Sequence, residues 1–266
     1  MDALTALPSL FISHGSPMLA VEDSATGRFL DGLGERLPTP RAVLVASAHF
    51  MTDVPTLTAT PLPETIHDFG GFPAPLYEIR YPAHGAPALA AQVARMLGDA
   101  GLAAVQDDGI GIDHGVWVPL RRMYPQADIP VVALSVNPYG SAEAHYRLGQ
   151  ALAPLREEGV LVIGSGGFSH NLRTLAWGDG HAAEFPWVRE FTDALREKLV
   201  EGDIDAALDW RALPHALRNH PTQEHLYPLY VALGAGGEGA HGRLLHRDVE
   251  MGGLALDAFA FAPARH

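Results

Sequence analysis

Three histidines in this chain, His14, His49 and His170, each follow an apolar run with the character of a β-strand. Small residues separate His170 from its run and allow a sharp turn there. The runs cover residues 10–13, 42–48 and 160–165. In an open α/β sheet, ligands bind beyond the carboxyl ends of the strands, so side chains from separate strands can meet there. We therefore take a histidine-rich metal site as the first hypothesis.

Each of these histidines also has a plainer interpretation. His14 could be a turn residue that bonds its own backbone. His49 follows small and branched apolar residues, and a buried imidazole in that place needs partners on both ring nitrogens, which a metal and a second acceptor would supply. The glycines before His170 could form a phosphate-binding loop, but their spacing matches neither common phosphate motif and no lysine follows.

The composition restricts what such a site can contain. The 266-residue chain has 14 histidines and no cysteine, which excludes disulfides, zinc fingers, thiolate metal sites and cysteine nucleophiles together. Metal chemistry must then use imidazole and carboxylate ligands. Three other histidines lie in polar or terminal segments and are expected to be solvated surface residues: His181, His241 and His266.

Charge and hydropathy narrow the choice of partners. The formal net charge is -13 with only 18 Lys and Arg, which argues against nucleic acid and against an anionic membrane, because both require a basic surface. No run approaches the ~18 apolar residues of a membrane span, and the N-terminus lacks the pattern of a signal peptide. We expect a cytoplasmic enzyme with a small-molecule substrate, and the sequence leaves its oligomeric state open.

Strand and helix patterns alternate along the chain, and its length favours one catalytic domain over residues 1–266. The alternation predicts an α/β single-domain sandwich whose central sheet is largely parallel or mixed, is flanked by helices, and has the metal site at the carboxyl ends of its strands. Helices are predicted at 87–99, 141–156, 184–200 and 222–234. Strands are predicted at 9–13, 42–48, 56–60, 130–136, 160–165, 243–248 and 254–261.

The segment from 60 to 87 breaks this alternation because it is rich in proline and glycine. Irregular segments of such length in compact domains are usually functional or disordered. This one carries several large apolar side chains, so we expect it to form an ordered lid over the strand ends. These side chains are Ile66, Phe69, Phe72, Leu76, Tyr77 and Tyr81.

Two further motifs could complete the site. His114 follows a glycine-rich stretch and precedes a short helical pattern, so it is either an acid or base in a cleft or a turn residue. The string from His220 to His225 is typical of a helix start, with Pro221 at the first helical position and Glu224 near the positive end of the helix dipole. There His220 and Glu224 could share a helix face. The adjacent Glu224 and His225 would point roughly 100° apart, so only one of them binds a given metal.

The ordered motifs of the chain resemble the class III extradiol ring-cleavage dioxygenases, specifically the DOPA 4,5-dioxygenase branch. The resemblance extends from residue 9 to about residue 262. Six strings in this order are a far more specific signal than any one of them alone. The strings are Ser13-His-Gly-Ser-Pro17, Ser47-Ala-His49, Thr65-Ile-His-Asp-Phe-Gly-Gly-Phe-Pro73, Asp113-His-Gly-Val-Trp117, Ser169-His-Asn-Leu-Arg173 and His220-Pro-Thr-Gln-Glu-His225.

This resemblance implies an α/β fold, a non-haem Fe(II) centre that often purifies with zinc, and cleavage of a catechol ring beside its paired hydroxyls with O2. It implies metal ligands at His14, His49 and His225. Other branches of the class use two histidines and one glutamate, which leaves Glu224 as the alternative third ligand.

Ring opening suits this set of residues. A catechol that binds Fe(II) through both oxygens, with O2 beside it, requires protein ligands on only one face of the metal. The resemblance places His170 and His114 beside the metal as acid-base groups, which an imidazole pKa of about 6.5 suits. We expect His170 to be the base, or a fourth ligand when zinc is bound, and His114 to steady bound oxygen or donate a proton.

The predicted substrate contacts come from the lid and from the segment after His170. Aromatic rings could stack on a catechol, and Arg80 or Arg173 could pair with a carboxylate. Ordinary packing of the lid on the core is the alternative role for the aromatic residues. The predicted substrate-binding residues are His67, Phe72, Tyr77 and Arg173, with Phe69 and Tyr81 as further aromatic candidates.

Two other functions use the same histidines. A zinc hydrolase would hold a hydroxide on the metal and use His170 as the base. A metal-binding or scaffold protein without catalysis would close the site with four protein ligands.

Overall fold

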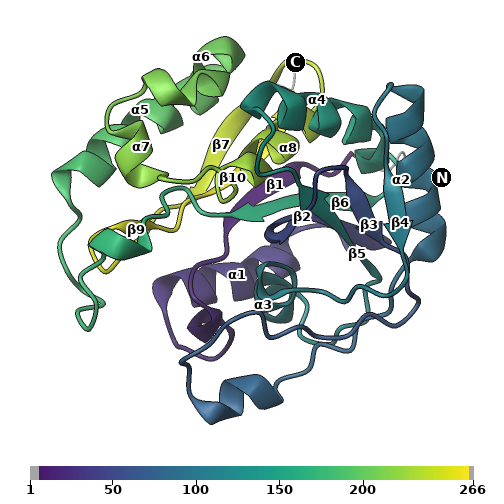
Figure 1. Cartoon of the computed structure of the whole chain (residues 1–266), viewed down its shortest axis with the longest axis horizontal. Coiled ribbons are helices and arrows are strands. Elements are labelled where there is room, and N and C mark those ends of the chain that lie inside the picture. Colours follow the sequence, from purple (N-terminus) through teal and green to yellow (C-terminus); the bar gives the residue numbers. More distant parts are fainter. Residues whose placement is uncertain (1–5, 264–266) are drawn as a thin grey trace.

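The computed structural model describes residues 6–263 and is built on a mixed sheet of eight strands (Figure 1). Across the sheet the strands follow the order β4, β3, β5, β2, β6, β1, β10, β7. Their bounds are β1 Ser9–Ser13, β2 Ala42–Met51, β3 Thr56–Thr58, β4 Val105–Asp107, β5 Val131–Val136, β6 Val160–Gly166, β7 Ala240–His246 and β10 Ala258–Pro263. A separate two-stranded ribbon pairs β8 (Val249–Glu250) with β9 (Leu254–Ala255).

The four central strands, β5, β2, β6 and β1, are parallel. In the middle of the sheet, Val45 of β2 pairs with Ala133 of β5 on one side and with Ile163 of β6 on the other. Antiparallel strands border this core, with β3 beside β5 and β10 beside β1. The carboxyl ends of β1, β2 and β6 therefore lie at one edge of the sheet. The predicted α/β fold with a mixed central sheet is confirmed.

Side chains of the central strands alternate between two covered faces. Leu10 and Ile12 of β1 pack with α1 and α3 on one face, whereas Phe11 packs with α5 and α8 on the other. Because both faces are buried, these strands are apolar at almost every position. The helices are α1 Ala25–Arg36, α2 Pro87–Asp99, α3 His114–Met123, α4 Ala142–Leu152, α5 Pro186–Glu201, α6 Ile204–Leu208, α7 Ala216–Asn219 and α8 Tyr227–Ala235.

Within residues 6–263, no helix combines the length and apolar character that crossing a membrane requires. Short 3-10 helices connect several of the strands and helices. The 3-10 helices are η1 Pro17–Ala20, η2 Ala74–Glu78, η3 Ala153–Arg156, η4 Leu172–Thr174 and η5 Trp210–Ala212.

The helix predicted at 222–234 is wrong at its start, because α8 begins only after His225. The carbonyl oxygen of His225 accepts a hydrogen bond from the N–H of Gly167, just past β6, at 2.9 Å. This segment is therefore held against the end of the sheet and does not enter a helical ladder. The prediction that His220 and Glu224 share a helix face is wrong for the same reason.

Two other predicted elements are each divided into two in the structure. The strand predicted at 254–261 is split into β9 and β10, and between them the N–H of Leu256 donates to the carbonyl of Asp248 at 2.8 Å. The helix predicted at 141–156 ends as α4 and continues only as the 3-10 helix η3. Pro154 has no N–H with which to continue an α-helical ladder there.

The irregular segment from 60 to 87 lies along the face that carries α1 and α3, at the lower edge of Figure 1. It contains the 3-10 helix η2 and is fixed by hydrogen bonds to the core. Trp117 Nε1 donates to the carbonyl of Ile66 at 2.9 Å, and the Tyr81 hydroxyl donates to the carbonyl of Tyr124 at 3.0 Å. The segment is thus anchored on both sides of residues 68–69, which contact His114.

Candidate metal centre

Three imidazoles from distant parts of the chain converge at the carboxyl ends of the strands. His14 directly follows β1, His49 lies near the end of β2, and His225 precedes α8. The Nε2 atom of His49 lies 3.1 Å from Nε2 of His14 and 3.3 Å from Nε2 of His225. These three residues form a group whose ligand atoms all lie within 4.8 Å of one another and could hold a metal ion.

The hydrogen bond at Nδ1 of His14 shows which tautomer this imidazole adopts. Its Nδ1 lies 3.0 Å from the hydroxyl of Ser165. That hydroxyl donates its own proton to the carbonyl of Gly115, so it must accept from the imidazole. The proton of His14 therefore sits on Nδ1, and Nε2 carries a lone pair.

Carboxylates fix the other two rings in the same way. Asp68 Oδ2 lies 3.3 Å from Nδ1 of His49, and Glu224 Oε1 lies 3.0 Å from Nδ1 of His225. A carboxylate only accepts, so Nδ1 of His225 donates in its hydrogen bond, and the negative charge of Asp68 favours a proton on Nδ1 of His49. The three Nε2 lone pairs consequently face one another, an arrangement that is repulsive by itself and that a cation would stabilise. The donor set fits a divalent metal on this ground.

Burial keeps these imidazoles neutral, as metal ligands must be. It lowers the pKa of His14 and of His225 well below the usual value, and the neighbouring imidazoles lower both further. Burial and the adjacent His114 lower the pKa of His49 to about 3, although Asp68 opposes them.

His114 lies beside this group at the start of α3. Its ring centroid is 3.9 Å from that of His49 and 5.3 Å from that of His14. Asp68 accepts from both the backbone N–H and the Nδ1–H of His114, each at 2.9 Å. Burial raises the pKa of Asp68, but the hydrogen bonds and charge of His114 outweigh it and bring the pKa to about 2. Asp68 thus bonds His114 directly and also lies 3.3 Å from Nδ1 of His49.

Asp68 was not among the predicted site residues. It lies in the motif Thr65–Pro73 of the lid segment, next to His67, which was chosen instead. The signal that could have found it is the chemistry of the cluster, since buried imidazoles need acceptors for their Nδ1–H groups and the lid segment offers a carboxylate.

His170 is stacked on His225. The two ring centroids are 3.4 Å apart and the planes differ by 6°. The backbone N–H of His170 donates to the carbonyl of Asn219 at 3.0 Å. Burial lowers the pKa of His170 to about 4, against the opposing effect of Glu224. His170, Glu224 and His225 form a second group that could hold a metal ion.

The predicted substrate-binding residues lie at different distances from this centre. His67 bonds the carbonyl of Ile79 through Nε2 at 3.1 Å, and the Tyr77 hydroxyl accepts from the N–H of Phe72 at 3.3 Å. These contacts stay within the lid segment. Arg173 is exposed on η4.

Two further aromatic candidates in the lid have different surroundings. The ring of Phe69 lies edge-to-face with His114 at 5.6 Å, so this residue brings the lid against the histidine cluster. Tyr81 is buried in the core and has its hydroxyl bonded to the backbone of Tyr124. The interpretation of Tyr81 as a packing residue therefore agrees with its position.

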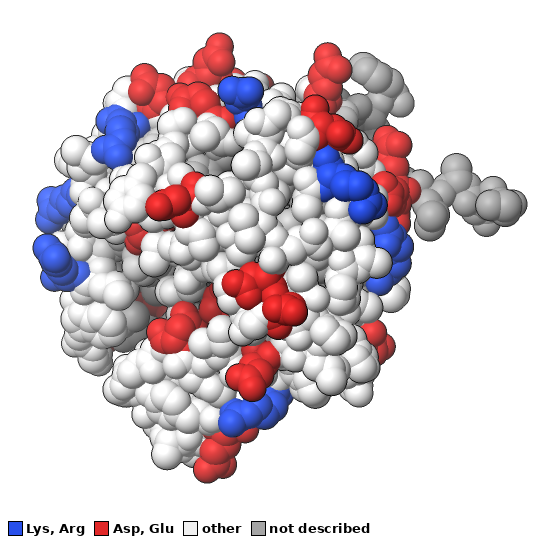
Figure 2. Space-filling view, turned by 45° about the vertical axis from the view of Figure 1, so that its right-hand side comes forward, with Lys and Arg blue, Asp and Glu red and all other residues white. Residues whose placement is uncertain are grey.

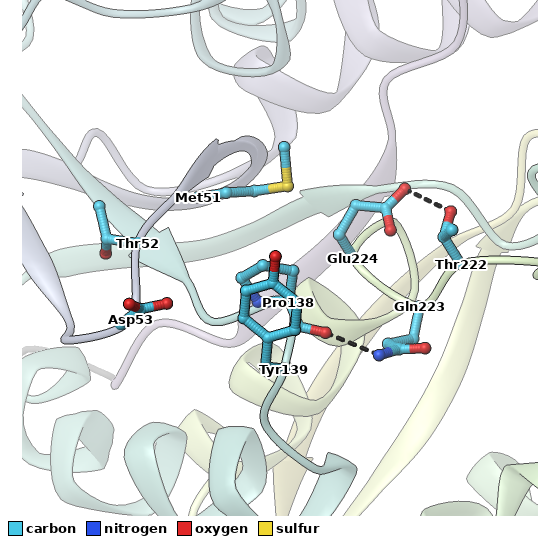
Figure 3. Close-up of a pocket in the computed structure, with 8 residues that line it drawn as sticks. All are labelled: Met51, Thr52, Asp53, Pro138, Tyr139, Thr222, Gln223 and Glu224. Carbon is cyan, nitrogen blue, oxygen red and sulfur yellow. Dashed lines mark hydrogen bonds between the residues drawn. The ribbon is translucent and has the colours of Figure 1, made fainter.

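A cavity of about 450 Å³ opens beside Glu224, where residues after β2 and β5 meet the loop before α8 (Figure 3). Asp53 and Glu224 give it two carboxylates, and Tyr139, 86% exposed, stands at its edge. Glu224 accepts from the hydroxyl of Thr222 at 2.9 Å, and Gln223 donates to the carbonyl of Pro138 at 2.6 Å.

The other histidines that the structure describes lie outside the cluster. His181 is exposed, as predicted, whereas His241 is half-buried on β7, so its prediction as a solvated residue is wrong in degree. β7 is the edge strand, but α5 packs against it near this residue. His266 lies outside the described residues.

Comparison with known proteins gives a consistent result. A family model described as the catalytic LigB subunit of aromatic ring-opening dioxygenase matches residues 8–255. The chain is 42% identical to a Beta vulgaris protein named 4,5-DOPA dioxygenase extradiol, with 95% of this chain and 96% of the relative covered. An Escherichia coli K12 protein of the same name is 39% identical over 95% of this chain and 93% of its own length.

A solved structure supports the same relationship. The crystal structure of an uncharacterized protein from Escherichia coli K12 matches with a TM-score of 0.82 and 34% sequence identity, covering 96% of this chain and 99% of that one. The family model spans most of the chain, and the relatives extend over nearly all of it. The chain therefore belongs to the LigB family of aromatic ring-opening dioxygenases and is an extradiol dioxygenase, as its ordered motifs predicted.

Proposed function

We propose that this enzyme uses Fe(II), held by His14, His49 and His225, to open the ring of a catechol with O2. Zinc is the metal we expect to compete for the same ligands during purification. Three protein ligands on one face would leave the opposite face of the metal open, where both catechol oxygens and O2 could bind. The observation that carries the proposal is the convergence of three neutral Nε2 atoms at 3.1 and 3.3 Å.

Two histidines beside the metal ligands, His170 and His114, would carry out the proton transfers of the reaction. Within residues 6–263, the ring of His170 has no hydrogen-bond partner, so its unprotonated nitrogen is free to accept a proton from a catechol hydroxyl. His114 is held by Asp68 through Nδ1, which leaves Nε2 as the atom that exchanges a proton with the reacting group. We assign His170 as the base and His114 as the proton donor. His170 would serve as a fourth ligand if zinc occupied the site.

The substrate class is an amino-acid catechol of the DOPA type. The cavity beside Glu224 carries two carboxylates, which suit the ammonium group of such a substrate. Arg173, an exposed cation in the segment after His170, would pair with its carboxylate. The names of the relatives from Beta vulgaris and Escherichia coli support this choice. A catechol acid without an amine, such as caffeate, should therefore show a higher KM than DOPA.

The test is anaerobic reconstitution of the purified protein with Fe(II), followed by DOPA or caffeate and then O2. We expect oxygen uptake together with a strongly coloured muconic semialdehyde product. His14→Ala should abolish both, whereas His181→Ala, a change at an exposed histidine, should leave them intact.

A zinc hydrolase is the competing outcome. If the zinc-loaded protein hydrolyses esters or amides, and the iron-loaded protein consumes no oxygen with any catechol, the dioxygenase proposal is wrong. We also propose a cytoplasmic location, which fractionation of cells that produce the protein would test.

A further inference from the structure

His220 is a buried histidine that the proposed reaction does not use. Its side chain is 1% exposed and lies edge-to-face with Phe191 and Trp210, at centroid distances of 5.6 and 5.9 Å. Its one polar contact among the described residues joins Nε2 to the carbonyl oxygen of Phe168 at 3.1 Å. A phenyl ring would fill this apolar place without burying a polar nitrogen, so the imidazole requires an explanation.

The chemistry of that contact fixes the tautomer of the ring. A carbonyl oxygen only accepts, so Nε2 of His220 carries the proton and donates it to Phe168. Nδ1 is then a buried lone pair, and within residues 6–263 it has no partner. An unpartnered buried nitrogen is destabilising. The hydrogen bond to Phe168 is therefore the feature that distinguishes this imidazole from a simple packing residue.

The bond belongs to a set that ties together two segments far apart in the sequence, 167–171 and 218–225. The other members are backbone Gly167 N–H to His225 O at 2.9 Å, His170 N–H to Asn219 O at 3.0 Å, and Asn171 Nδ2 to Arg218 O at 2.7 Å. Directly before the first segment, at the end of β6, a Cβ on Gly166 would lie 2.1 Å from the carbonyl oxygen of His225, so the backbones are in close contact there.

We propose that His220 is a positioning residue, which through Phe168 holds the backbone that carries His170 and so maintains its stack on His225. The first segment carries the base and the second carries a metal ligand, so their register sets where the base stands relative to the substrate. The proposal rests on the proposed function, because the role of His170 does. Displacement of a catalytic group by about 1 Å can cost on the order of a hundredfold in rate.

Two substitutions separate the hydrogen bond from packing. His220→Phe keeps the ring but removes the donor, whereas His220→Gln can place an amide N–H where Nε2 stands. We expect the Phe variant to lower kcat about tenfold or more, while KM changes less than about threefold and the iron content stays the same. The Gln variant should recover most of the lost kcat.

His145→Phe is the matched control. His145 is also buried and bonded to backbone, through Asn137 and Ser141, but that turn does not carry His170. This variant should have a comparable melting temperature to His220→Phe and retain the kcat of the unchanged protein.

Amide hydrogen exchange gives a readout that does not depend on activity. In the full-length protein, with and without metal, His220→Phe should speed exchange across 167–171 about tenfold or more and leave the central strand β6 unchanged. Exchange rates and kcat equal to those of the unchanged protein would overturn the proposal. So would a well-folded Gln variant as impaired as the Phe variant. If the unchanged protein opens no catechol, the proposed function fails, and the exchange comparison still decides whether His220 holds the segment.

Discussion

At the scale of single residues, each proposed metal ligand has a side chain with acceptor oxygens beside its Nδ1 atom. Ser165 serves His14, and a carboxylate serves each of the other two. Such partners set the direction of the ligand lone pair and raise the affinity of the site for metal. The adjacent residues Glu224 and His225 therefore take different roles, and substitution can tell them apart.

The two residues should respond differently to removal. His225→Ala deletes an Nε2 donor, so the protein should retain less than about a tenth of its iron after reconstitution and lose activity. Glu224→Gln keeps all three imidazoles and should weaken iron affinity only about 10–100-fold. Metal analysis after dialysis against graded iron concentrations measures both. The reverse pattern would identify Glu224 as the ligand.

Asp68 should contribute to turnover through the histidines beside it, but less than a metal ligand does. Asp68→Asn removes the negative charge that faces Nδ1 of His114 and of His49. We expect kcat to fall about 10–100-fold, with most of the iron retained. The matched control is Asp108→Asn, at an exposed residue, which should leave kcat unchanged. Equal kcat values for the two variants would show that Asp68 does not orient the site.

Residue types and motif order were enough to select the cluster, but they could not define its pairing. The five histidines chosen from the sequence, at positions 14, 49, 114, 170 and 225, do come together in the structure. Asp68 was missed because a carboxylate in a proline-rich segment usually faces solvent. Only the path of the lid over α3 brings it to His114, and that path depends on contacts such as that between Trp117 and Ile66.

At the scale of elements, continuous apolar runs predicted the central strands well because those strands are covered on both faces. β1 and α2 begin and end at the predicted residues. The start of α8 was wrong because its local signals, a proline followed by an acidic residue, are outweighed by the backbone pairing of His225 with Gly167. Tertiary hydrogen bonds of this kind leave no pattern in the sequence.

Helix α1 was missed for a different reason. It contains Gly27, Gly32 and Gly34, and glycine is about 1 kcal/mol less favourable than alanine inside a helix. Two of these glycines permit close packing on α3. A Cβ on Gly34 would lie 2.0 Å from the carbonyl oxygen of Met123, and one on Gly27 would lie 2.0 Å from the guanidinium of Arg122.

Substitution by alanine should therefore have opposite effects on stability at two glycines of α1, Gly34 and Gly32. Gly34→Ala should destabilise the protein by about 1–3 kcal/mol, because the added methyl group meets rigid backbone. Gly32→Ala meets only the tip of the flexible Arg36 side chain, at 3.2 Å, and should stabilise by about 0.5–1 kcal/mol. Urea unfolding of both variants measures the difference. Equal stabilities would mean that α1 moves away from α3 at little cost.

At the scale of the whole molecule, acidic residues outnumber basic ones, with 31 Asp and Glu against 18 Lys and Arg. Most of them are at the surface, but one, Asp257, is buried in an ion pair. On the face in Figure 2, Asp and Glu side chains extend across the centre and Lys and Arg lie mainly toward the edges. Inside the protein, Asp257 between β9 and β10 is fully buried and accepts from Arg196 of α5 at 2.9 and 3.1 Å. Its backbone oxygen also accepts from the hydroxyl of Ser13, the residue before His14, at 2.9 Å.

This carboxyl should make the stability of the whole fold depend on pH. Burial raises the pKa of Asp257 to about 6, although Arg196 and Arg247 oppose the rise and Glu184 adds to it. The unfolded chain releases this proton near pH 4 and the folded chain only near pH 6, so the stability that the group contributes is full below pH 4 and is lost as the pH rises to 6. The shift corresponds to about 3 kcal/mol.

Asp257→Asn removes this titration and leaves the others in place. The free energy of unfolding of the unchanged protein, minus that of the variant, should therefore fall by about 3 kcal/mol between pH 4 and pH 7. Urea unfolding of both proteins in the presence of a chelator measures it, because without metal the histidine cluster titrates equally in both and cancels. Parallel profiles would mean that the Arg196 pair offsets the burial of the carboxylate. A difference that grows with pH would mean that the pair outweighs burial and lowers the pKa of Asp257 below its usual range.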